Sequence, residues 1–173
     1  MQVGPIYFAT PRKCHVFWMC AEGTGIHRFY MIDESEKVAI VSQVWCTTIF
    51  LTLALEKNMQ RNVYLRIHFD NAVGQNKNNT ILGYCMWRVL TGLHESVSLS
   101  MMLPGHTKFT PDWHFGVWKI KWRQSDAECM EDIAYTVKAS SRSGHNIPQR
   151  VNDPSRPVVF LNWKTFFENY FKL

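Results

Sequence analysis

Residues 65–79 read LRIHFDNAVGQNKNN, which is the strongest local pattern in the chain. Its first half continues an alternation that begins at Val63, so that every second residue up to Phe69 is apolar. Side chains alternate between the two faces of a strand, and the pattern therefore predicts a strand with one buried face. Asp70 ends this strand and projects from its polar face.

The turn after this strand is unusually rich in amides. Asn71, Gln75 and Asn76 follow Asp70, and Lys77 adds a positive charge. Ligands of open α/β sheets bind at the carboxyl ends of strands, which makes Asp70 the first candidate for chemistry. The alternative is an Asp-Asn turn that caps the strand and satisfies its own backbone. The local pattern leaves both interpretations open.

A second acidic residue is predicted at the start of a helix. Thr110 suits the N-cap position and Pro111 the first helical position. One helix face then carries residues at spacings of four, three and four, namely Asp112, Gly116, Lys119 and Arg123. Gly116 would leave the space beside Asp112 open. The alternative is that Asp112 only complements the helix dipole.

The other elements are predicted from periodicity and from capping patterns. Strands are expected at residues 6–8, 15–20, 26–32, 97–103 and 158–160. Helices are expected at residues 35–57, from 79 or 80 to a C-terminal Gly92, after a capping box formed by Ser125 and Glu128, and at 163–171. Residues 140–157 are rich in Ser, Asn, Arg and Pro and predict a mobile loop.

Composition limits the class of protein. The chain has 173 residues, of which 46% are hydrophobic, and this predicts one globular domain and excludes a disordered chain. The net charge of +5 favours a polyanionic partner. The spacings of the five cysteines suggest no disulfide framework, and we expect reduced thiols in an intracellular protein.

Residues 38–55 contain no charged side chain, which reaches the lower length limit of a membrane span. Ser42, Gln43 and Thr47 dilute this segment, however, and predicted strands flank it. We therefore expect a helix buried in the domain, with no membrane contact. We also expect no small-molecule cofactor.

The order of predicted elements resembles the ribonuclease H-like fold of integrases and DDE-type transposases. Two motifs resemble a transposon-derived domain of unknown function in more detail, namely residues 70–79, DNAVGQNKNN, and residues 105–112, GHTKFTPD. Four shorter segments also fit: residues 4–8 (GPIYF), 10–14 (TPRKC), 87–93 (WRVLTGL) and 143–147 (SGHNI). The resemblance covers nearly the whole chain.

The resemblance implies an α/β fold with a mixed sheet, built from a three-strand meander and then alternating helix–strand units, and flanked by helices. In the family a first strand with a first acidic residue precedes the segment at residues 4–8, and we expect that strand to be missing here. The expected core spans residues 1–139, the loop residues 140–157, and a strand–helix extension of the same domain residues 158–173.

The resemblance also implies a chemistry, which is metal-assisted attack on a phosphodiester. Asp70 and Asp112 would be the catalytic and metal-binding acids, with Mg²⁺ or Mn²⁺ as the cofactor. The supporting residues would be His106, Gln75, Asn76 and Asn71. Four cations would contact the DNA backbone, namely Lys77, Lys108, Lys119 and Arg123.

With one acid missing, this reaction should be weak or absent, because metal affinity depends on the number of ligands. The expected function is a transposase- or integrase-like core fragment that acts on DNA, in the nucleus of a eukaryotic cell. The alternative is a non-catalytic remnant that binds nucleic acid or protein.

Overall fold

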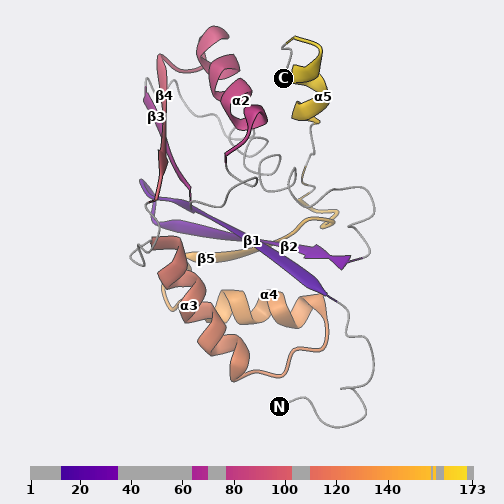
Figure 1. Cartoon of the computed structure of the whole chain (residues 1–173). Helices are drawn as coiled ribbons and strands as arrows, with labels where there is room; N and C mark the ends of the chain where they lie inside the picture. Colours follow the sequence, from indigo (N-terminus) through magenta and orange to yellow (C-terminus); the bar gives the residue numbers. More distant parts are fainter. Residues whose placement is uncertain are drawn as a thin grey trace. The chain divides into compact units, whose positions relative to one another are not determined.

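The computed structural model describes residues 13–34, 64–69, 77–102, 110–156, 158 and 162–170. These residues form a mixed α/β structure, which confirms the predicted class; the ribonuclease H-like arrangement stays a prediction. The elements are β1 (Cys14–Ala21), β2 (Ile26–Asp33), β3 (Tyr64–Phe69), α2 (Asn79–Leu90), β4 (Ser96–Met101), α3 (Thr110–Arg123), α4 (Met130–Ala139), β5 (Asn146–Arg150) and α5 (Trp163–Glu168) (Figure 1).

The chain forms two compact units, and each draws on two separate stretches of sequence. The first unit contains β1, β2, α3, α4 and β5, and the second contains β3, α2, β4 and α5. The expectation that residues 158–173 extend the same domain as residues 1–139 stays a prediction.

The first unit begins with the predicted hairpin. β1 and β2 pair antiparallel from Cys14 opposite Asp33 to Ala21 opposite Ile26. The turn between them ends at Gly25, whose φ of 65° lies in the left-handed region that glycine adopts without strain. The turn residues therefore fix the register of the hairpin.

The predicted loop at residues 140–157 is wrong in its middle part. Residues Asn146–Arg150 form β5, which pairs in parallel with β2 and places Gln149 opposite Tyr30. The segment lacks apolar alternation and contains Pro148, which hid the strand from sequence reasoning. Among the described strands, β5 lies at the edge of its sheet, a position where proline is tolerated because its missing N–H is not needed by a second neighbour.

Helices α3 and α4 lie against the three-stranded sheet of the first unit (Figure 1). Their core contains Phe29 of β2, Trp118 of α3 and Val137 of α4, all nearly inaccessible to solvent. The indole Nε1 of Trp118 donates a hydrogen bond of 3.0 Å to the hydroxyl of Thr136, which joins the two helices.

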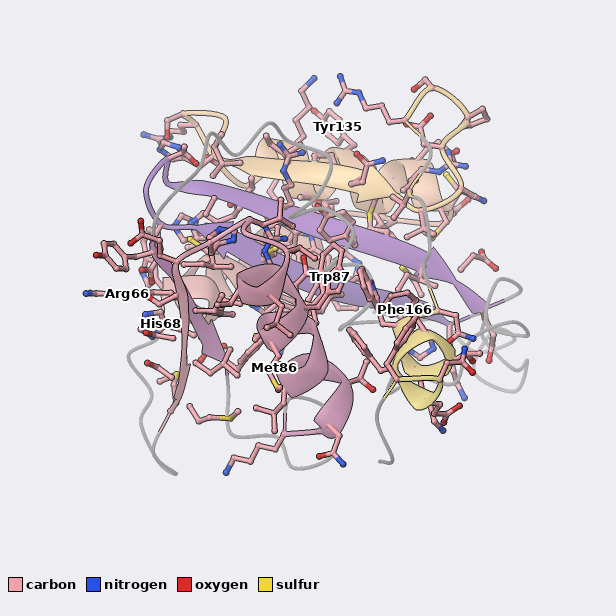
Figure 2. The ribbon with its side chains drawn as sticks, turned by 90° about the horizontal axis from the view of Figure 1, so that it is seen from above. Arg66, His68, Met86, Trp87, Tyr135 and Phe166 are labelled. Carbon is pink, nitrogen blue, oxygen red and sulfur yellow. The ribbon has the colours of Figure 1, made fainter. Side chains whose placement is uncertain are left out.

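The second unit contains a parallel pair of strands, β3 and β4, in register from Tyr64 opposite Ser96 to Phe69 opposite Met101. The predicted alternation of β3 is confirmed: Ile67 packs on Ile81 of α2, whereas Arg66 and His68 are exposed and project from the other side of the strand (Figure 2). β3, α2 and β4 thus form one strand–helix–strand unit.

Helix α2 begins and ends close to the predicted positions. Its N-cap is Asn78, one residue before the expected cap, and the Asn78 side chain accepts a hydrogen bond from the backbone of Ile81. Gly92 follows the helix with a φ of 72°, as predicted for a terminating glycine. α5 packs on α2, where the Phe167 ring approaches within 3.2 Å of the place that a Cβ on Gly83 would take.

The predicted capping box of α4 is displaced by four residues. The helix begins after Cys129, and the Asp132 carboxylate accepts hydrogen bonds from the backbone N–H groups of Glu128 and Cys129. Ser125 instead donates its hydroxyl proton to the Lys121 carbonyl at the end of α3. The predicted strand at residues 6–8 and helix at residues 35–57 lie outside the described residues, as do Val159 and Phe160 of the predicted last strand.

None of the helices within the described ranges is long and apolar enough to cross a membrane. The uncharged segment at residues 38–55 lies outside these ranges.

Candidate functional site

Most residues of the predicted acidic site lie outside the described residues: Asp70, Asn71, Gln75, Asn76, His106 and Lys108. Asp70 follows Phe69 directly in sequence, and Phe69 is the last residue of β3 at the carboxyl end of the parallel pair. The predicted approach of Asp70 and Asp112 therefore stays a prediction.

Three of the predicted site residues lie on one described helix, α3. Asp112 lies in the first turn, Lys119 in the second half and Arg123 at the end, and all three are exposed. A Cβ added to Gly116 would meet no atom within 4 Å, which confirms that the space between Asp112 and Lys119 is open. The helical spacing puts the four residues on one face. We call this surface the α3 face.

Among the described residues, no carboxylate forms an ion pair with either cation of the α3 face. The Lys119 ammonium lies 5.1 Å from the centre of the Phe115 ring, a favourable cation–π distance that leaves the charge unpaired. Lys77 is also exposed but belongs to the second unit, just before the cap of α2. The α3 face can therefore attract a polyanion, while Asp112 offers one carboxylate to a cation.

A metal ion needs more than this one carboxylate. Within the described ranges, no group of three His, Cys, Asp or Glu side chains is arranged to hold a metal ion. Asp112 is suited to Mg²⁺ or Mn²⁺ by its oxygen donors. The other predicted ligand, Asp70, is not described, so the metal site stays a prediction.

Sequence reasoning missed a pocket in the first unit. The pocket has a volume of about 600 Å³, within the range of ligand sites, and three segments form it. These segments are the β1–β2 hairpin, the α3 helix and the connection from α4 to β5. Its lining includes Cys20, Glu22, His27, Trp113, His114, Val117, Ser141, Arg142, Ser143, His145 and Asn146. We call it the histidine pocket.

Two stacked imidazoles form one side of the histidine pocket. The ring centres of His27 and His114 are 3.4 Å apart with an angle of 26° between the planes. Cys20, the cross-strand neighbour of His27, places its Sγ 3.5 Å from His27 Nε2. The backbone N–H of His27 donates a hydrogen bond of 2.8 Å to the carbonyl of His145, which ties β2 to the start of β5.

Burial keeps these imidazoles uncharged at neutral pH. It is the main cause that lowers the pKa of His27 to about 4, with smaller contributions from the neighbouring His114 and His145. Burial also lowers the pKa of His114; the Asn146 side chain opposes this shift, and His145 adds to it. Burial likewise raises the pKa of the Cys20 thiol, and Glu22 adds to that shift. The deep part of the pocket is therefore neutral.

Within the described residues, one buried polar atom beside the histidine pocket lacks a hydrogen-bond partner, namely Nδ1 of His27. His27 is only 2% exposed. A buried polar atom without a partner costs about 1–3 kcal/mol, and sites that carry such atoms are often completed by a ligand or water.

One part of this arrangement is accessible to sequence reasoning. A hairpin with the turn at residues 22–25 places Cys20 opposite His27, so this pair follows from the predicted register. The approach of His114 and His145 could not be predicted, because it depends on the packing of α3 and on the unpredicted strand β5.

Comparison with known proteins gives one match. No curated protein and no solved structure matches the chain significantly. A family model described as a domain of unknown function, DUF7869, matches residues 9–172, which is nearly the full length. The chain therefore belongs to the DUF7869 family of domains of unknown function.

Proposed function

We propose that the chain is a transposase- or integrase-like core fragment that binds DNA and whose ancestral reaction was metal-dependent phosphodiester cleavage or strand transfer. The observation that supports this best is the α3 face, where exposed Asp112 shares an open surface with Lys119 and Arg123. Unpaired cations on one face suit contacts to phosphates.

The second unit supports the proposal independently. The parallel strands β3 and β4 end together, and Asp70 is the next residue after β3. This is the edge of an α/β sheet where binding residues usually lie. The fold expected from the resemblance is ribonuclease H-like, and the described strand–helix–strand unit is compatible with it.

In this proposal the two carboxylates of Asp70 and Asp112 hold Mg²⁺ or Mn²⁺, which would polarise the phosphate and activate the attacking oxygen. His106 and the amides of Asn71, Gln75 and Asn76 orient the phosphate or water. Lys77, Lys108, Lys119 and Arg123 hold the DNA backbone.

The alternative is a binding module without catalysis, and one observation favours it. Helix α3 also exposes large apolar side chains, with Trp113 66% and Ile120 59% accessible. Such side chains beside cations are typical of a surface that binds a partner and are not required by the acidic site.

The DNA-binding part is tested by reversing the charges of the α3 face. The variant Lys119→Glu/Arg123→Glu should bind a fluorescent duplex at least roughly tenfold more weakly and reduce the slope of log affinity against log salt by about 2. The matched control is Lys138→Glu/Arg156→Glu, which changes the same charge at exposed positions elsewhere in the first unit. If both variants lost the same DNA affinity, net charge alone would explain the effect. That result would contradict the assignment of DNA binding to the α3 face.

The metal-binding part is tested by calorimetric titration of Mn²⁺ into the wild-type chain, Asp70→Asn and Asp112→Asn. Binding that each substitution abolishes is the expected result and would justify cleavage assays on DNA. If wild-type chain binds DNA but not Mn²⁺, the non-catalytic alternative is correct.

A further inference from the structure

The geometry points to a nucleotide site in the first unit: we propose that the histidine pocket receives one unpaired nucleotide of bound DNA, with its base against Trp113 and its phosphate at Arg142. This inference rests on the proposed DNA binding and specifies which form of DNA is preferred. The pocket belongs entirely to the first unit, so its geometry does not depend on the second.

The walls of the pocket suit a flat, mostly apolar ligand. Trp113 and Val117, one helical turn apart on α3, supply apolar lining. The Trp113 ring stands at 90° to the His114 ring, with 4.6 Å between the ring centres, and 66% of Trp113 is exposed. This leaves aromatic surface available, and nucleobases of any sequence stack on such surfaces.

The charge distribution favours a base inside the pocket and a phosphate at its rim. His27 and His114 are uncharged at neutral pH because burial lowers their pKa values, and the deep part therefore offers no cation to an anion. Arg142 is exposed, forms no ion pair with another described residue and lines the pocket with Ser141 and Ser143. Glu22, at the hairpin, also lines the pocket, and its negative charge would repel a phosphate placed beside it.

Polar side chains that line the pocket can hydrogen-bond to the edge of a base. The hydroxyl of Ser143 donates or accepts, and the imidazole of His145 donates or accepts according to the tautomer. Both residues line the pocket and are exposed. Proteins that bind an extruded base combine stacking with hydrogen bonds of this kind.

The pocket also lies next to the proposed DNA track. Trp113 follows Asp112 directly and Val117 follows Gly116, so the pocket wall and the α3 face are adjacent stripes of one helix. A DNA backbone that crosses Lys119 and Arg123 therefore passes beside the pocket. Duplex DNA cannot enter, because its bases are stacked and paired.

The experiment measures by anisotropy the affinity of a fluorescent single-stranded oligonucleotide and of the matching duplex for five chains, namely the wild type, three single variants and the variant Lys119→Glu/Arg123→Glu. The substitution Trp113→Ala should weaken single-strand binding at least about fivefold and change duplex binding less than about twofold. The control Tyr135→Ala removes an aromatic side chain that is 70% exposed on α4 (Figure 2) and should change neither affinity. Arg142→Gln should reduce the salt slope of single-strand binding by about 1.

The possible results separate this inference from the proposed function. If Lys119→Glu/Arg123→Glu weakens binding of both DNAs while Trp113→Ala changes neither, the pocket assignment is wrong and DNA binding stands. Equal losses for single strand and duplex in Trp113→Ala would also overturn it. A wild-type chain that binds neither DNA would overturn both proposals.

Discussion

The two units each bury a cluster of polar side chains, and the clusters differ in the charge that they hold. In the second unit, Arg88 of α2 is 2% exposed; its Nε donates to His94 Nδ1 at 3.1 Å, and its Nη1 donates to the Tyr84 hydroxyl. In the first unit, the two stacked side chains are His27 and His114, whose pKa values are lowered by burial. Within the described residues, His94 Nε2 in one cluster and His27 Nδ1 in the other are both buried without a hydrogen-bond partner.

This difference separates a structural role from a binding role. Arg88 donates hydrogen bonds to two partners inside the unit, where it joins the end of α2 to the segment before β4. The stacked histidines instead line a pocket of about 600 Å³. A buried charge without good partners is strongly destabilising, so Arg88 must stay paired. A neutral imidazole without a partner costs less free energy, so it can remain without a partner until a ligand binds.

The largest effect is expected from Arg88→Ala. The substitution leaves the Tyr84 hydroxyl and His94 without the donor that they share, and it opens a cavity, so we expect the free energy of unfolding to fall by about 3–4 kcal/mol. Urea unfolding followed by circular dichroism measures it. The control Arg66→Ala removes an exposed arginine of the same unit and should change stability by less than about 0.5 kcal/mol. If the free energy of unfolding fell by a similar amount in both variants, the structural role assigned to the Arg88 cluster would be wrong.

A smaller effect should follow from acidification of the histidine pocket. The pKa of His27 is about 4 in the folded chain and 6.5 when exposed, so the unfolded chain binds more protons between these values. The contribution of neutral His27 to the free energy of unfolding is fully present above pH 6.5. It is lost as the pH falls to 4, and the loss is at most about 3 kcal/mol.

Stability measured at steps between pH 7 and 4 tests this expectation, because His27→Gln should flatten the profile in that window. The control His68→Gln changes an exposed histidine of β3 and should leave the profile unchanged. An unaltered profile in His27→Gln would show that protonation of this cluster does not limit stability.

The smallest effect concerns a polar contact of the first unit that is satisfied. Thr136→Val removes the acceptor of the Trp118 indole and should cost about 1–2 kcal/mol, because the buried N–H loses its partner. Thr136→Ser keeps the hydroxyl and should cost less. The same thermal or urea unfolding measures both variants. Because Val keeps the methyl group and Ser keeps the hydroxyl, a loss of stability in Thr136→Ser as large as in Thr136→Val would contradict a dominant role of the hydrogen bond.

Local sequence patterns predicted the elements whose signals are strong. The alternation of β3, the turn of the β1–β2 hairpin and the capping residues of α2 and α3 each act within a few residues, and the structure confirms these elements with shifts of one or two positions. β5 was missed because its stability comes from pairing with β2, more than one hundred residues earlier, and not from its own composition.

The candidate site divides in the same way. The spacing of Asp112, Gly116, Lys119 and Arg123 was sufficient to place them on one helix face. The histidine pocket was not predictable, because His27, His114 and His145 come from three elements that only tertiary packing brings together. Lone histidines in a sequence carry no spacing rule, whereas residues of one helix do.

The pairing of β5 with β2 has a consequence for synthesis on the ribosome. Tyr30 emerges long before its partner Gln149, and α5, which packs on α2, follows later still. The first unit cannot close before β5 has emerged and the second cannot close before α5 has emerged, so the nascent chain exposes the edge of β2 until β5 leaves the ribosome. A premature stop codon before residue 146 would leave both units unfinished, and the quality-control machinery of the cell would meet a chain with an open sheet rather than a smaller domain.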